Sequence, residues 1–261
     1  MSKTFDIVKK IPEITLLFWI TKITATTLGE TAGDLLSMTL NVGYGISSLI
    51  LISFFLVVLA GQLLVKKYIP PLYWAVIVAT STAGTTLSDY MDRTLGLGYA
   101  LGSLILVTIL IIILSIWRAT EKSLSVTDIK TRRAELFYWA AILFSNTLGT
   151  ALGDFLADSS GLGFAGSAIL ISSVLALVVL AHYFTKISSV ILFWIAFVLT
   201  RPFGATFGDL LTKTPDKGGM DLGTKGSSLV LFVLLVVLVI YESVKEKSTS
   251  VEDVSPAHIK T

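Results

Sequence analysis

Residues 139–154 read WAAILFSNTLGTALGD, and the same pattern occurs four times along the chain. Each copy begins with a tryptophan, has a glycine ten residues later and ends on an aspartate fifteen residues after the tryptophan. The tryptophans are Trp19, Trp74, Trp139 and Trp194, the glycines are Gly29, Gly84, Gly149 and Gly204, and the aspartates are Asp34, Asp89, Asp154 and Asp209. The tryptophans are 55, 65 and 55 residues apart. Such a register predicts four structural repeats.

The composition around these copies is that of a membrane protein. Of the 261 residues, 54% are hydrophobic and 15% are charged, whereas soluble domains carry about 25% charged residues. Uncharged runs such as 35–65 and 94–117 are long enough to cross a bilayer as helices. This pattern excludes a soluble enzyme and an outer-membrane barrel, whose strands would alternate with a period of two. The net charge of +2 gives no indication of nucleic-acid binding.

Each repeat contains two apolar segments, so we expect an all-α membrane protein with eight transmembrane helices. The expected helices are about 14–37, 45–65, 71–91, 98–117, 136–157, 163–183, 187–211 and 225–242. The chain would form a single integral membrane domain over residues 1–261, with repeats at 12–67, 68–118, 134–186 and 187–245. The odd-numbered helices carry the polar residues, and the even-numbered helices are almost purely apolar.

Basic residues are distributed unevenly over the expected loops. The two tails and the loops after the second, fourth and sixth helices contain 14 lysines and arginines, and the opposite loops contain 4. The positive-inside rule therefore predicts cytoplasmic N- and C-termini. Every repeat then crosses the membrane in the same direction, so the four repeats are parallel, and each aspartate is expected toward the outer face.

With two membrane segments and one tryptophan in each of four tandem units, the chain resembles the bacterial integral membrane proteins built from domain of unknown function 347. The resemblance extends over residues 12–245. It implies eight transmembrane helices in a bacterial inner membrane. It implies no established activity, so the function has to be argued from the residues themselves.

Polar residues follow one face of each odd-numbered helix. Positions seven, eleven and fifteen residues after each tryptophan are four apart, so they lie on the same face. Small residues ten and fourteen positions after the tryptophan lie beside this face and allow close helix packing. We therefore expect the odd helices to form a polar inner bundle. The candidate binding residues on the face are Lys22, Thr26, Glu30, Asp34, Asp89, Asn146, Asp154, Arg201 and Asp209.

Five carboxylates on this face are the strongest indication of chemistry. A charge at the centre of a membrane costs about 2.5–3.5 kcal/mol even on the most lenient scale, so these groups should face one another, water or a cation. The candidate metal ligands are Glu30, Asp34, Asp89, Asp154 and Asp209. Set against Lys22 and Arg201, they give the face a formal charge of −3. Arg201, followed by a proline, is expected to pair with Glu30 or with one of the aspartates, or to bind an anionic substrate.

The oxygen-only ligand set favours H⁺, Na⁺ or a hard divalent ion such as Mn²⁺ or Mg²⁺. We therefore expect an inner-membrane transporter of a small cation. Two alternatives stay open: a channel along the pseudo-fourfold axis, and a non-transporting scaffold or sensor whose charges only neutralise one another or cap helix ends. No catalytic motif or cofactor motif occurs, so no enzyme is expected. The expected partners are the lipid bilayer and a small cation or small-molecule substrate, with no nucleic acid, and a homo-oligomer is compatible with the sequence.

Overall fold

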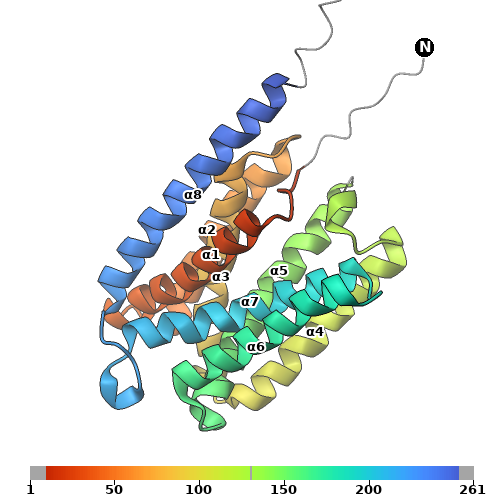
Figure 1. Ribbon diagram of the computed structural model, residues 1–261. Coiled ribbons are helices and arrows are strands. Elements are labelled where there is room, and N and C mark those ends of the chain that lie inside the picture. Colours follow the sequence, from red (N-terminus) through yellow and green to blue (C-terminus); the bar gives the residue numbers. More distant parts are fainter. Residues whose placement is uncertain (1–9, 130, 253–261) are drawn as a thin grey trace, which may run out of the picture.

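The computed structural model describes residues 10–129 and 131–252, and these residues contain helices and no strands. Figure 1 shows a bundle of long helices in which the start of the described chain and the end of α8 lie toward the same end. The long helices are α1 (Leu16–Asp34), α2 (Tyr44–Leu64), α3 (Pro70–Asp89), α4 (Gly98–Glu121), α5 (Arg132–Asp154), α6 (Gly163–Phe184), α7 (Ser189–Thr212) and α8 (Thr224–Glu252). These bounds agree with the expected segments within a few residues, except that α8 continues well beyond its expected end at residue 242.

Six helices of the described chain are long and apolar enough to cross a membrane, as expected of a membrane protein. They are α2, α4, α5 together with the turn after it, α6, α7 and α8. The helices α1 and α3 are outside this set because charged and hydroxyl side chains interrupt their apolar sequence. The even helices expose most of their apolar side chains: only 22% of the most apolar window of α2 is buried, compared with 67% for α5.

The helices pack in a cyclic order. The helix α1 contacts both α3 and α7, and α5 also contacts both α3 and α7, so the first helices of the four repeats form a closed ring. The second helix of each repeat packs on the first helix of the next repeat: α2 on α3, α4 on α5, and α6 on α7. The last helix, α8, returns to pack on α1. The second helix of each repeat therefore covers the first helix of the next repeat, and the second helix of the fourth repeat covers the first helix of the first.

The two helices of each repeat are joined by a common turn. In every repeat a glycine with positive φ immediately precedes or starts the second helix, and another residue with positive φ lies two positions earlier. A side chain with a Cβ is strained in this conformation, which explains the glycine. The paired positions are Asn41 and Gly43, Gly96 and Gly98, Gly161 and Gly163, and Asp221 and Gly223. In the first three repeats a π-helical turn, Leu35–Thr39, Tyr90–Thr94 and Phe155–Ser159, directly follows the repeat aspartate.

Candidate functional site

The glycine ten residues after each tryptophan brings neighbouring polar faces into contact. A Cβ added to Gly149 would lie 2.2 Å from Cγ of Arg201, and one added to Gly84 would lie 2.9 Å from the backbone nitrogen of Thr147. Gly29 contacts Ser81 in the same way. Gly204 contacts Thr26 and so closes the ring. Only glycine permits this distance between helices, and as a result the polar face of each odd helix lies against the next odd helix.

All nine candidate site residues are buried. Their exposed fractions are at most 3%: Lys22, Thr26, Glu30, Asp34, Asp89, Asn146, Asp154, Arg201 and Asp209. Burial of charge on this scale requires compensation by partners, because an unpaired buried charge is very costly. For the five carboxylates the structure provides these partners in three groups along the odd helices.

The first group joins Glu30 of α1 to Arg201 of α7. The Nη1 atom of Arg201 donates to Oε2 of Glu30 at 3.0 Å, which is one of the alternatives that the sequence left open. The Nη2 atom of Arg201 donates to the hydroxyls of Thr85 on α3 and Thr150 on α5, each at 2.6 Å. Both hydroxyls in turn lie 3.3 Å from Oε2 of Glu30. This group therefore connects all four odd helices, while Nε of Arg201 is buried without a hydrogen-bond partner.

The second group lies at the aspartate end of α3 and α5. The guanidinium of Arg93 bridges Asp89 of its own repeat, at 2.9 Å, and Asp154 of the following repeat, at 3.0 Å. It also lies against the rings of Tyr44 and Tyr99, with centroid distances of 5.9 and 5.7 Å. One cation thus compensates two buried carboxylates.

The third group repeats this arrangement on the opposite side of the ring. Lys213 lies 3.1 Å from Asp209 of its own repeat and 2.5 Å from Asp34 of the first repeat. The carboxylates of Glu30, Asp34 and Asp209 place one oxygen each within 4.8 Å of one another, a spacing at which a single cation could contact all three. Lys213 is 18% exposed, so this end of the triad is the part that solvent can approach.

Lys22 shares a face of α1 with Glu30, but its hydrogen-bond partners lie on α7. Its ammonium donates to the backbone oxygen of Phe197 at 3.0 Å and to the hydroxyl of Thr200 at 2.5 Å. It also lies 3.8 Å from the centroid of the Phe197 ring. Within the described chain no ion pair joins Lys22 to a carboxylate, because Arg201 occupies the position beside Glu30.

The remaining two candidates form hydrogen bonds at the same level of the ring. The hydroxyl of Thr26 donates to the backbone oxygen of Thr200 at 3.3 Å. The amide of Asn146 donates to the hydroxyl of Thr80 at 2.9 Å, and its Oδ1 atom is buried without a partner. Neither residue contacts the carboxylate triad in the hydrogen bonds of the described chain, so they belong to the ring wall rather than to the acidic cluster.

Comparison with known proteins identifies the repeats. A family described as Repeat of Unknown Function (DUF347) matches the chain four times, at residues 17–68, 72–123, 137–188 and 192–248. The chain belongs to this family. No curated protein and no solved structure matches it. The four DUF347 units have the same spacing as the four tryptophans, which confirms the tandem repeats expected from the sequence.

The DUF347 repeats alternate in one respect that the sequence analysis missed. Arg93 and Lys213 were counted with the loops from the sequence. Arg93 is four residues after the repeat aspartate of the second unit, and Lys213 is four residues after that of the fourth. The first and third units have Met38 and Asp158 at this position. The i, i+4 spacing from Asp89 and Asp209 was the signal that could have found them. With both bases included, the cluster has five acidic and four basic groups, a formal charge of −1 rather than −3.

Proposed function

We propose that this protein is a transporter of a small cation in the bacterial inner membrane, rather than an enzyme. In this proposal all eight helices cross the bilayer, with α1, α3, α5 and α7 as a polar inner bundle and the even helices as the lipid-facing shell. The burial of the polar faces supports this arrangement, since α1 and α3 are protected from lipid by their neighbours. Most of the basic loop residues lie on the same side of the bundle as the two tails, and this supports cytoplasmic termini.

The observation that carries the proposal is the triad of Glu30, Asp34 and Asp209. Three buried carboxylate oxygens within 4.8 Å of one another form a ligand set for a hard cation. In the described state the ammonium of Lys213 neutralises two of them. A long, partly exposed lysine can withdraw toward solvent, so we propose that the transported cation and Lys213 occupy the carboxylates alternately.

The alternation gives the site two states of similar charge. With Lys213 bound, the triad needs no external cation, and with a cation bound, the lysine is released. Arg201 stays fixed in both states because it is completely buried and connects Glu30 to Thr85 and Thr150. Arg201 thereby offsets the desolvation cost of Glu30 in both states. Only Asp34 and Asp209 exchange their partner.

Ion flux into proteoliposomes tests the proposal directly. The wild type should carry one or more of H⁺, Na⁺, Mg²⁺ and Mn²⁺, and Glu30→Gln and Asp209→Asn should lose that flux while remaining folded. Asp216→Asn is the matched control, because Asp216 is exposed in the loop after α7. This variant should retain full flux.

A structural role is the second candidate function, and the nearly complete pairing of the charges favours it. In that case the wild type would carry none of the four ions above background, and the same substitutions would change only stability. Ohmic conductance without saturation would instead indicate a channel along the ring axis.

A further inference from the structure

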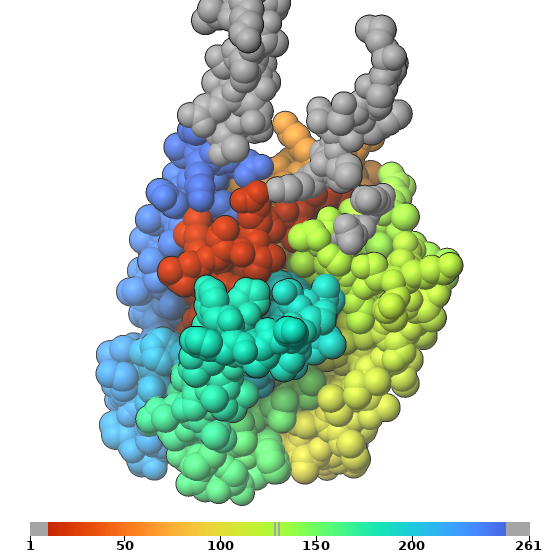
Figure 2. All heavy atoms as spheres, turned by 45° about the vertical axis from the view of Figure 1, so that its right-hand side comes forward, coloured from red at the N-terminus to blue at the C-terminus, as the bar shows by residue number. Residues whose placement is uncertain are grey.

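A pocket of about 550 Å³ lies at the tryptophan end of the bundle, and none of the acidic residues Glu30, Asp34, Asp89, Asp154 and Asp209 lines it. It is enclosed by the start of α1, the loop before α5, the end of α6 and the start of α7. Figure 2 shows this region, with the start of α1 in red next to the junction of α6 and α7 in teal. Its volume is within the range of about 300–1,000 Å³ that is typical of small-molecule sites.

The pocket lies where the third repeat departs from the packing of the second and fourth repeats. The residue nineteen positions after the turn glycine is Trp117 in the second repeat and Glu242 in the fourth. Trp117 packs on the repeat tryptophan Trp194 with ring centroids 5.7 Å apart, and Glu242 accepts a hydrogen bond from Trp74 at 2.7 Å. In both places an even helix closes the gap beside a repeat tryptophan two units away in the ring.

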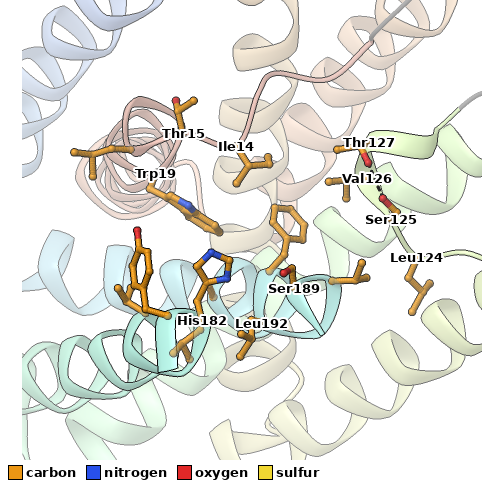
Figure 3. A pocket seen from close by; sticks show the side chains of 17 residues that line it. Ile14, Thr15, Trp19, Leu124, Ser125, Val126, Thr127, His182, Ser189 and Leu192 are labelled. Atoms are coloured by element: carbon orange, nitrogen blue, oxygen red, sulfur yellow. Dashed lines mark hydrogen bonds between the residues drawn. The ribbon is translucent and has the colours of Figure 1, made fainter. Parts of the chain in front are cut away.

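The equivalent pair in the third repeat is His182 and Trp19. Both side chains line the pocket, and Figure 3 shows the imidazole pointing into it from α6 on the side facing the indole. The smaller imidazole leaves a space that a tryptophan such as Trp117 would fill. Whereas Trp117 is 1% exposed, His182 is exposed, so the third repeat is more open at this position than the second.

The chemistry of the lining identifies the kind of ligand. The interior is apolar, with side chains such as Val178, Leu192 and Phe193, and the lining contains no charged residue. The apolar wall continues onto the outer surface of α6, where Val179 is 55% exposed and Tyr183 is 75% exposed. An apolar slot that is open toward the apolar surface of a membrane helix suits a hydrocarbon chain.

Hydroxyl side chains lie at one edge of the pocket, and exposed lysines lie near the lining residues in sequence. The hydroxyls of Ser125 and Thr127, bonded to each other at 2.7 Å, lie on one side of it, as Figure 3 shows. Lys122 is two residues before the lining residue Leu124, and Lys186 is three residues after the lining residue Tyr183; both lysines are exposed. Helix ends with basic loops lie at the level of lipid headgroups on the cytoplasmic side, where anionic lipids attract lysine.

We propose that the pocket between α1, α6 and α7 binds one phospholipid with an anionic headgroup. An acyl chain fills the apolar interior beside Trp19, and the phosphate lies at the rim, within reach of Lys122 and Lys186. The bound lipid replaces the side chain that closes the equivalent gap elsewhere in the ring. This site is separate from the carboxylate triad and does not depend on the proposed transport function.

Native mass spectrometry of the protein in mild detergent, supplied with phosphatidylglycerol or phosphatidylcholine, tests the proposal. We expect one phosphatidylglycerol adduct on the wild type and at least a tenfold lower occupancy on His182→Trp, which restores the residue type of the second repeat. Ile169→Trp is the matched control on the exposed face of α6 near its other end, and it should retain the adduct. If His182→Trp does not fold, Val179→Trp blocks the same slot.

The headgroup is tested with the double variant Lys122→Gln/Lys186→Gln. It should lower the binding of phosphatidylglycerol at least tenfold and leave that of phosphatidylcholine unchanged, whereas Lys66→Gln/Lys67→Gln in another exposed loop should change neither. A phosphatidylglycerol adduct that persists in both blocking variants, or that is lost equally in the Ile169→Trp control, would overturn the proposal. So would a wild type that binds no lipid or that holds a soluble molecule or a second copy of the chain at this surface.

Discussion

The Nη1 atom of Arg201 lies 3.0 Å from Oε2 of Glu30, and both side chains are shielded from solvent, although 171 positions separate them in the chain. The pair connects the first and the last repeat. Because Thr85 and Thr150 complete the hydrogen bonds of the same guanidinium, the contact also fixes the second and third repeats. The ring of odd helices is therefore held together by one buried cation as well as by its glycine contacts.

Replacing Arg201 with methionine should strongly destabilise the protein. Loss of one partner of a buried ion pair costs about 3–5 kcal/mol, because the other charge is left uncompensated. The double variant Arg201→Met/Glu30→Gln should recover a large part of that loss. The free energy of unfolding, measured by denaturant titration in detergent, gives the coupling. Additive losses in the double variant would show that the two side chains do not interact as described.

Arg93 should be replaceable by lysine but not by glutamine. Its role between Asp89 and Asp154 is the one that Lys213 has between Asp209 and Asp34, so an ammonium at this position can serve. We expect Arg93→Gln to lower the thermal unfolding temperature clearly and Arg93→Lys to lower it much less. Arg118→Gln, at an exposed position in the last turn of α4, is the control for loss of one arginine. Equal losses for the two Arg93 variants would argue against the bridging role.

Lys213→Gln should increase the apparent affinity of the proposed cation site. Removing the ammonium leaves Asp34 and Asp209 free to bind an added cation, and we expect the half-saturating concentration to fall about tenfold, or about 1.4 kcal/mol. The measurement is flux into proteoliposomes at increasing cation concentration. Lys217→Gln, in the exposed loop nearby, should behave as the wild type. An unchanged half-saturating concentration in Lys213→Gln would contradict the alternating occupancy.

Gly149→Leu should prevent correct packing of α5 against α7. Even a Cβ at this position would lie 2.2 Å from Arg201 and 3.0 Å from Pro202, so a larger side chain has no space. The cost should be at or above the upper end of the about 1–3 kcal/mol that is usual for overpacking. Gly226→Leu is the control, because nothing lies within 4 Å of a Cβ there. Size-exclusion profiles and unfolding curves of the two variants should differ; indistinguishable behaviour would show that the odd helices approach less closely.

The orientation in the membrane can be tested with single cysteines, because the natural sequence contains none. Asp216→Cys, in the loop after α7, should react with a membrane-impermeant maleimide from the outer side of the inner membrane. Thr127→Cys, in the loop before α5, should react only after the membrane is permeabilised. Both positions are exposed, so burial does not bias the comparison. The reverse pattern of labelling would show that the termini lie on the outer side.

The sequence by itself determined the elements of this fold. The register of Trp19, Trp74, Trp139 and Trp194 and the fifteen-residue distance to each aspartate predicted four repeats, and apolar length predicted the helices within a few residues. These features are local: helix formation depends on neighbouring residues, and the face on which a side chain lies follows from the helical period. The possible partners of Arg201 could be limited to Glu30 and the aspartates because few charged residues lie within the helices.

Only the tertiary structure decided which helix covers which and where the charges meet. That α2 packs on α3, that Lys213 reaches Asp34, and that His182 leaves a pocket beside Trp19 depend on contacts between residues far apart in the chain. The helical period does not encode such contacts, because each odd helix could place its polar face against either neighbour. The order of the helices in the ring depends on where small residues of two helices meet and allow the backbones to approach. Such meetings exist only once the repeats have assembled.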